Sequence, residues 1–357
     1  DTEAIKNAIN NGMNPNTQHE EGSSFLHFAA EQDNRILVKF LINKGANVNL
    51  QENDGATPLL LASQNNNYET MKLLIENGAD VNLKSIHGYT PLKSASSILN
   101  NVDAANLLLN NGADVNACDI DGVSPLLMAS QQNYTSIVNM LLNNNANPNL
   151  IDKNGYNSLH MPCERGHDNI VKLLLSKGVD INIQDKDGDT PLMIASKNGF
   201  KNIVELLLNE NAKLNLQNKN GDTALIWASY KNHFEVVRLL IEKKANINLI
   251  GKGGTTALDC SINNKNNLMT DFLIESGANK IVVRGEALHA TLEAACFKGD
   301  KIFIQLSLDN GADINFRSSN GNTPLITASN YGHLDIVNIL IDNGALLDSV
   351  NKKNITA

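Results

Sequence analysis

The stretch DGDTPLMIASKNGFKNIVELLLNENAKLN at residues 187–215 decides the fold. The dipeptide Asp187-Gly188 is a turn signal, because glycine tolerates the positive φ that a tight reversal of the chain demands. Thr190 can cap a helix through its hydroxyl, and Pro191 suits the first helical position, where its missing N–H costs nothing. The sequence therefore predicts that a short helix begins at Pro191.

Two apolar faces follow this turn at helical spacing. Leu192 and Ala195, three residues apart, form the inner face of the first helix, where alanine lets a neighbouring helix come close. Asn211 then takes a C-terminal position that favours the left-handed conformation. Between Ala195 and Asn211, a second helix is predicted from an apolar stripe made of Ile203, Val204, Leu206 and Leu207. Each unit is thus a turn followed by two helices.

The same unit recurs along almost all of the 357 residues. The position of Thr190 is filled along the chain by Ser24, Thr57, Thr90, Ser124, Asn157, Thr190, Thr223, Thr256, Ala290, Thr323 and Thr356. Eight of the ten intervals are 33 residues and two are 34. A fixed period of this length is typical of stacked-repeat proteins, because a unit of this size cannot bury its apolar face alone.

The strings NDGATPLLLAS, KDGDTPLMIAS and NGNTPLITASNYGHLDIVNILIDNGA closely resemble ankyrin repeats, and this resemblance covers essentially the whole chain. It implies a β-hairpin finger, two antiparallel helices and a loop in each repeat. We therefore expect an all-α solenoid of about ten full repeats, with partial repeats at both ends. Because both ends fall inside a repeat, we also expect a fragment of a longer protein.

Residues 1–357 are expected to form a single solenoid with three irregular places. One extra residue predicts a bulged loop near Ile98–Val102, and Pro162 predicts a distorted first helix in its repeat because it removes a backbone donor. The largest departure is KIVVRGEALHA at 280–290, where the glycine turn is missing. Here we expect a bend or a subdomain junction, followed by one helix over Glu286–Cys296 that begins early.

Composition and charge exclude several classes of protein. No apolar run is long enough to span a bilayer, and no signal peptide is recognisable, so no membrane association is expected within this segment. The net charge of −9 argues against nucleic acid. Residues 1–120 hold 14 acidic and 7 basic residues, whereas the other thirds are nearly balanced. The acidic end is therefore N-terminal.

The sequence offers no catalytic, cofactor or metal site. No Ser/His/Asp set, HExxH or GxxxxGKS string is present. The cysteines show no CxxC pair or disulfide spacing, so a reduced cytoplasmic compartment fits best. His27 and His160 follow Thr-Pro-Leu-type strings, where structural hydrogen bonding is expected. The enzyme hypothesis therefore has no support in the sequence.

Partner-facing positions in ankyrin arrays are mainly the finger tips and the exposed end of the first helix. By register these positions include Tyr89, Lys153, Tyr156, Arg165, Lys186, Lys197, Lys219, Tyr230, Lys231, Phe297 and Tyr331. Aromatic residues are favoured as interface hot spots, although the same rings can simply shield apolar surface between repeats. Trp227 is expected at a repeat interface, and becomes a candidate anchor if it is partly exposed.

Two further patterns remain open alternatives. Lys153, Lys186, Lys219 and Lys252 are spaced by 33 residues, which predicts a row of charges along the finger tips. Such a row can orient a charged partner. Alternatively, lysine followed by Asp or Asn before glycine is simply the usual composition of an ankyrin finger. A second set resembles the asparagines that are hydroxylated in some ankyrin fingers, namely Asn82, Asn116, Asn182 and Asn315.

The resemblance implies a non-catalytic scaffold or adaptor that binds protein partners through the groove of finger tips and first helices. We expect it to be a monomer. The alternative is the recognition segment of a larger bacterial effector, toxin or channel, whose activity lies outside this chain. Under that alternative the compartment could be a host cytosol. The identity of the partner does not follow from the sequence, because one fold carries many functions.

Overall fold

The computed structural model describes the chain except residues 1, 98–99, 101, 279–285 and 310. The described residues fold into successive helix pairs, which confirms the predicted all-α solenoid of repeats. Two compact units are formed, Asp1–Thr255 and Thr256–Ala357. Each unit is described by itself below.

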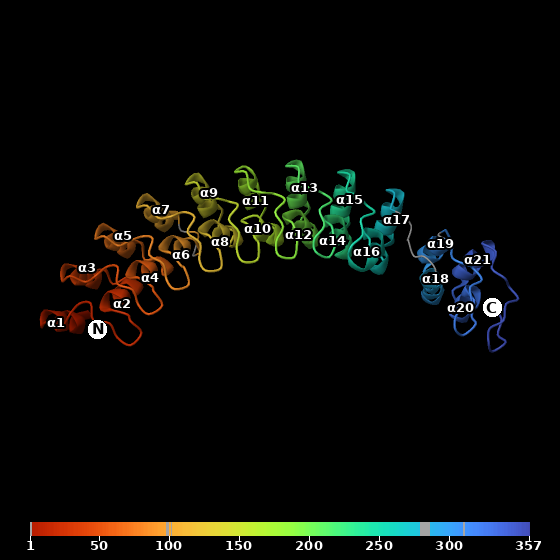
Figure 1. The fold of residues 1–357 in the computed structure, drawn as a ribbon, viewed down its shortest axis with the longest axis horizontal. Helices are drawn as coiled ribbons and strands as arrows, with labels where there is room; N and C mark the ends of the chain where they lie inside the picture. Colours follow the sequence, from red (N-terminus) through yellow and green to blue (C-terminus); the bar gives the residue numbers. More distant parts are fainter. Residues whose placement is uncertain (1, 98–99, 101, 279–285, 310) are drawn as a thin grey trace. The chain divides into compact units, whose positions relative to one another are not determined.

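The first unit is a stack of helix pairs in two rows, with the connecting turns projecting beyond the first helices (Figure 1). The first helices of its repeats are α2 (Phe25–Glu31), α4 (Pro58–Gln64), α6 (Pro91–Ser97), α8 (Pro125–Gln131), α10 (His160–Arg165), α12 (Pro191–Asn198) and α14 (Ala224–Tyr230). The second helices are α1 (Thr2–Asn10), α3 (Arg35–Asn43), α5 (Tyr68–Glu76), α7 (Val102–Asn110), α9 (Thr135–Asn143), α11 (Asp168–Leu175), α13 (Lys201–Asn209) and α15 (Phe234–Glu242). A short 3-10 helix, η1 (Lys252–Gly254), lies near the end of this unit.

The second unit continues the same pairing. Its helices are α16 (Ala257–Asn263), α17 (Asn267–Glu275), α18 (Glu286–Lys298), α19 (Lys301–Asp309), α20 (Pro324–Asn330) and α21 (Leu334–Asp342). The prediction of an early helix at Glu286 is confirmed by α18. Most of the predicted bend at 280–290 lies outside the described residues, as does most of the predicted bulge near Ile98–Val102. The bend and the single solenoid therefore stay predictions.

The first helices begin where the threonine and proline positions predict. The hydroxyl of Thr190 accepts a hydrogen bond from the backbone N–H of Met193 at 3.3 Å, and Pro191 opens α12. Asn211 has a φ of 63°, the left-handed conformation expected after α13. Since both ends of each helix are fixed by local chemistry, helices of this length are stable once they are packed.

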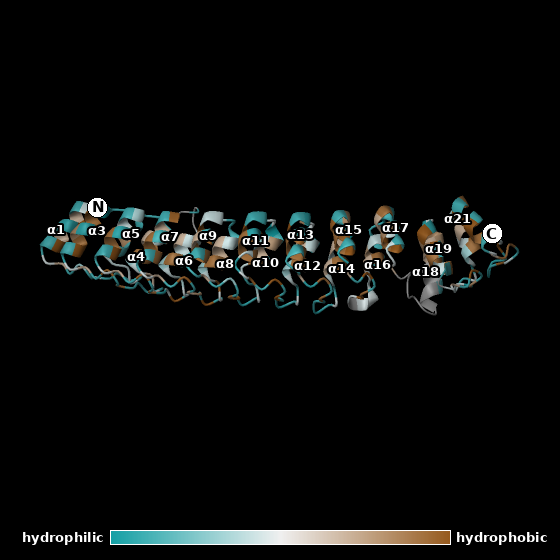
Figure 2. Cartoon of the chain, turned by 90° about the horizontal axis from the view of Figure 1, so that it is seen from above, coloured by the Kyte–Doolittle hydropathy of each residue, from teal (hydrophilic) through white to brown (hydrophobic). Residues whose placement is uncertain are grey.

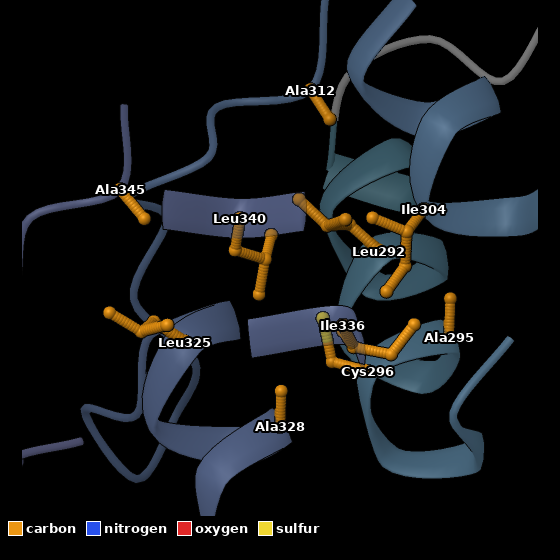
Figure 3. Close-up of a cluster of buried hydrophobic side chains, with 10 residues drawn as sticks. All are labelled: Leu292, Ala295, Cys296, Ile304, Ala312, Leu325, Ala328, Ile336, Leu340 and Ala345. Carbon is orange, nitrogen blue, oxygen red and sulfur yellow. The ribbon is translucent and has the colours of Figure 1, made fainter. Parts of the chain in front are cut away.

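Packing buries one face of each helix against its neighbours. Leu192 and Ala195 of α12 and Ile203 and Leu207 of α13 are all fully or almost fully buried. Hydrophilic and hydrophobic residues therefore share each short helix (Figure 2). In the second unit the corresponding core gathers between α18, α19, α20 and α21 (Figure 3). The core thus runs along each stack between the helix rows.

Pro162 shortens the first helix of its repeat, as predicted. Whereas the other first helices of the first unit start directly after the threonine position, α10 starts three residues after Asn157, at His160. Proline has no N–H to donate to the carbonyl four residues before it, at Ser158, so the first turn is not helical. The side chain of Asn157 instead accepts from the backbone N–H of Leu159 at 3.0 Å.

The fingers are tight turns that bond to one another through the backbone. In one finger the N–H of Asp185 donates to the carbonyl of Asp189 at 3.0 Å, and Gly188 has a φ of 83°. Lys219 then donates its backbone N–H to Asp187 of this finger at 2.9 Å. Within the described residues the fingers carry one isolated antiparallel bridge, between Gln18 and Ser24, and no strand.

Asparagine side chains form a second connection between repeats. The side-chain oxygen of Asn82 accepts from the backbone N–H of Asp114 at 2.8 Å, and its amide donates to the carbonyl of Gly112 at 2.9 Å. The same bridge to a backbone N–H of the next repeat is made by Asn16, Asn49, Asn116, Asn149, Asn182, Asn215 and Asn315. We call this series the asparagine ladder. It contains all four asparagines that resemble hydroxylated ones.

Across the part of the chain that the structure describes, no helix has both the length and the apolar character needed to cross a membrane.

Candidate functional site

The predicted lysine row is present along the fingers of the first unit. Lys153 and Lys186 donate their backbone N–H groups to the carbonyls of Asp121 and Asn154 in the preceding fingers, at 2.7 and 2.8 Å. Lys219 repeats this contact, so the three residues are held in line while their side chains stay exposed. The side chain of Lys252 lies outside the described part of the chain.

Lys153 differs from the other two lysines because its ammonium pairs with Asp121 at 2.9 Å. This hydrogen bond and the positive charge of Lys153 hold the pKa of Asp121 below its usual value. Both side chains are well exposed, so the pair contributes little to stability. Among the described residues, Lys186 and Lys219 have no carboxylate within ion-pair distance.

Three predicted residues come together around Trp227, on the first helices α12 and α14. The ammonium of Lys197 lies 4.2 Å from the centre of the Trp227 ring. Tyr230 meets Trp227 edge to face, with ring centres 6.0 Å apart, and Lys231 lies 5.2 Å from the centre of the Tyr230 ring. We call these four residues the Trp227 cluster. Exposed contacts between cations and rings contribute about 0.5–1 kcal/mol each.

Trp227 is held in one orientation by the preceding repeat. Its indole N–H donates to a carboxylate oxygen of Asp189 at 3.3 Å, and the same oxygen accepts from the Asn218 amide at 2.7 Å. Trp227 is therefore half-buried at a repeat interface, as expected, with part of its ring accessible. Tyr230 beside it is 56% exposed. The cluster thus presents a fixed aromatic surface to solvent.

The carboxylates near this surface are mostly engaged inside the fingers. One oxygen of Asp185 accepts backbone N–H bonds from Asp187 and Asp189, both at 2.8 Å. Burial raises the pKa of Asp185 despite these bonds. Burial, assisted by the charge of Asp189, also raises the pKa of Asp222. The Asp185 carboxylate therefore serves its own turn rather than the outer surface.

Tyr89 and Tyr156 each contact a side chain of their own repeat. The ammonium of Lys93 lies 4.3 Å from the centre of the Tyr89 ring. Tyr156 stacks on His160, with ring centres 5.0 Å apart and planes within 8°. Stacking on a buried histidine leaves Tyr156 only partly exposed. For Tyr156 the shielding role is therefore better supported than an anchoring role.

The side chain of Arg165 is hydrogen-bonded to the preceding repeat. Its guanidinium donates to the carbonyl of Gln131, near the end of α8, at 3.0 Å. The guanidinium retains further donors for a partner, since it carries five N–H groups. It does not join the Trp227 cluster in any hydrogen bond, ion pair or ring contact of the described residues.

Phe297 and Tyr331 form an aromatic pair of their own in the second unit. Their ring centres are 4.4 Å apart at an angle of 66°, and the two side chains are 51% and 54% exposed. The carbonyl of Phe297 also lies 3.0 Å from a ring nitrogen of His333. The predicted residues thus fall into local groups in both units.

A strip of apolar side chains was missed from the sequence. Met128, Met161 and Ile194 occupy the position four residues after the threonine position, which Trp227 fills in its own repeat. The two methionines are partly exposed and Ile194 is 8% exposed. The repeated apolar character at this position was the available signal. Met128 and Met161 thus add partly exposed apolar surface to the first helices, whereas Ile194 is buried between them and Trp227.

Two buried cysteines, Cys163 and Cys296, have thiols of low reactivity. Burial raises the pKa of Cys296 to about 12 and that of Cys163 further, so neither thiol ionises readily. Among the described residues, no group of three or more histidine, cysteine or acidic side chains is arranged to hold a metal ion.

Comparison with known proteins agrees with this geometry. A family model described as "Ankyrin repeats (3 copies)" matches residues 1–85, 37–119, 92–185, 126–218, 173–250, 192–284 and 291–357. The chain belongs to the ankyrin-repeat family. Ankyrin repeats are generally protein–protein interaction modules and typically carry no catalytic activity.

One curated relative is "Protein fem-1 homolog C" of Xenopus laevis. It is 46% identical over 50 residues, which are 14% of this chain and 8% of that protein. The chain therefore spans less than a tenth of the relative's length, and the likeness concerns little more than one ankyrin repeat.

Proposed function

We propose that this chain is an ankyrin-repeat scaffold or adaptor that binds a partner protein along the first helices and fingers of its first unit. The observation that carries the proposal is the Trp227 cluster. It combines a rigid aromatic surface with charged side chains, as the centres of protein interfaces often do. A preformed surface of this kind loses little conformational freedom on binding.

The neighbouring repeats support the same face. The partly exposed Met128 and Met161 fill the same helix position in earlier repeats as Trp227 does in its own, and Lys186 and Lys219 are exposed on finger tips of the same unit. Free, mostly buried cysteines suit a reducing cytoplasmic compartment. We propose that compartment as the site of action, with the chain acting as a monomer.

The test compares partner capture by two single variants. Tyr230→Ala removes an exposed ring from the proposed surface, whereas Ile36→Ala removes an apolar side chain, 72% exposed, from the second helix α3. We expect Tyr230→Ala to lose the proteins captured from a lysate, as measured by quantitative mass spectrometry, and Ile36→Ala to retain them. Equal capture by both variants would contradict the proposed surface.

A further inference from the structure

The ammonium groups of the Trp227 cluster have no acidic partner in the described part of the chain. Lys197 and Lys231 contact the faces of Trp227 and Tyr230, and no carboxylate of a described residue lies within 4.0 Å of either ammonium. Lys231 is exposed and Lys197 is partly exposed, and contacts between a cation and a ring at the protein surface are weak. Both lysines are therefore available to an anionic group from outside.

The carboxylate that contacts the cluster, that of Asp189, does not pair with these lysines. Asp189 points one oxygen at the Trp227 indole and the Asn218 amide, so it orients the ring. Asp185 is bonded to the backbone of its own finger. Other carboxylates on the first helices and fingers include the exposed Glu164, at the end of α10, the exposed Asp187, at a finger tip, and the partly exposed Asp222.

The order of chemical groups along the cluster is cation, ring, ring, cation. Successive contacts measure 4.2, 6.0 and 5.2 Å from Lys197 through Trp227 and Tyr230 to Lys231. A matching ligand carries an apolar side chain for the rings and a carboxylate on each side for the ammoniums. Lys186 and Lys219 extend the positive charge along the finger tips.

We propose that the Trp227 cluster binds an extended acidic segment of the partner protein, in which an apolar side chain is flanked by carboxylates. This inference rests on the proposed function and specifies its partner by charge. The opposite arrangement, in which a basic side chain of the partner displaces Lys197 from the indole, is a different outcome of the same test.

The experiment uses the full chain and three short labelled peptides of equal length, in which leucine alternates with glutamate, lysine or glutamine. Affinity is measured by fluorescence anisotropy of the label. Emission from Trp227 reports where the peptide binds, because it is the only tryptophan in the chain. We expect the glutamate peptide to bind at least about tenfold more tightly than the lysine peptide and to change Trp227 emission. Added salt should weaken this binding because it screens the charges.

Matched variants separate the proposed lysines from charge in general. Lys197→Ala with Lys231→Ala should weaken the glutamate peptide by about tenfold or more. Lys243→Ala, at the end of the second helix α15, should leave its affinity unchanged. Circular dichroism checks that each variant keeps its helices.

The outcomes distinguish this inference from the proposed function. Tighter binding of the lysine peptide, or equal binding of the glutamine peptide, contradicts the acidic partner but not the proposed binding surface. Unchanged affinity in the double variant also overturns it. If no peptide binds, the acidic segment is rejected, while the capture test with Tyr230→Ala decides the proposed function separately.

Discussion

Lys93 and Asp119 form an ion pair in which both side chains are buried, 1% and 5% exposed. Lys93 lies in α6, and Asp119 organises the finger of the next repeat by accepting backbone N–H bonds from Asp121 and Val123, both at 2.9 Å. The pair thus joins two consecutive repeats through charges that are shielded from water. Such a pair is sensitive to the loss of either partner.

The first prediction concerns this ion pair. Lys93→Met should destabilise the protein by about 3–5 kcal/mol, because the Asp119 carboxylate stays buried without its counter-ion. Lys93→Met combined with Asp119→Asn should recover most of this loss, since asparagine still accepts from the finger backbone. Urea unfolding followed by circular dichroism measures both variants. A double variant as unstable as Lys93→Met alone would show that the charge is not the cause.

The second prediction compares two glycines of consecutive repeats. Gly178 and Gly188 both have positive φ, at 72° and 83°, so alanine at either should cost about 1 kcal/mol. At Gly188 an added Cβ would also lie 2.9 Å from the backbone nitrogen of Lys219, whereas at Gly178 it would meet nothing within 4 Å. Gly188→Ala should therefore have the lower urea midpoint. Similar midpoints would mean that the neighbouring finger can shift to make room for the added Cβ without a loss of stability.

The third prediction concerns acid stability. Burial holds the pKa of His160 at about 4, against 6.5 for an unperturbed histidine. Between these values the unfolded chain binds a proton that the folded chain does not, so stability present above pH 6.5 is lost as the pH falls. The loss should reach about 3 kcal/mol near pH 4. Amide hydrogen exchange in α10 at pH 7 and pH 5 measures the loss, which should be about 2 kcal/mol at pH 5.

A pair of variants isolates this histidine. His160→Gln should reduce the dependence of α10 protection on pH, because glutamine does not titrate. His19→Gln, at an exposed position, should leave it as in the parent chain. An unchanged pH dependence in His160→Gln would assign the effect to other groups, such as His27, whose pKa is also lowered by burial.

The fourth prediction tests the asparagine ladder. Asn82→Ala removes two hydrogen bonds to the next repeat, which together should contribute about 1–2 kcal/mol. Asn139→Ala, on the exposed face of α9, should be neutral or slightly stabilising because alanine favours helix. The comparison again uses urea midpoints. If the two variants unfold alike, the ladder does not hold the repeats together.

The order of the elements could be predicted from the sequence because it depends on local chemistry. Thr190 and Pro191 open α12 as expected, and Asn211 takes the left-handed conformation that ends α13. The early start of α18 at Glu286 was likewise visible as a missing turn signal. Each of these features is decided within a few residues of chain.

The site was less predictable because it depends on contacts between repeats. The orientation of Trp227 is set by Asp189, 38 residues earlier. Tyr156 was a predicted partner-facing residue. Its stacking on His160 follows from the burial of the histidine ring, which the sequence alone does not show. The burial of Lys93 had no sequence signal, since lysine is normally exposed and its partner lies 26 residues away.

The asparagine ladder and the backbone bonds between fingers have an evolutionary consequence. Cohesion of the stack relies on main-chain groups and on asparagines set back from the finger tips. Residues such as Lys186 and Lys219 can therefore mutate with little penalty to assembly. New binding preferences can arise by substitution at the tips alone, while the underlying architecture is inherited unchanged.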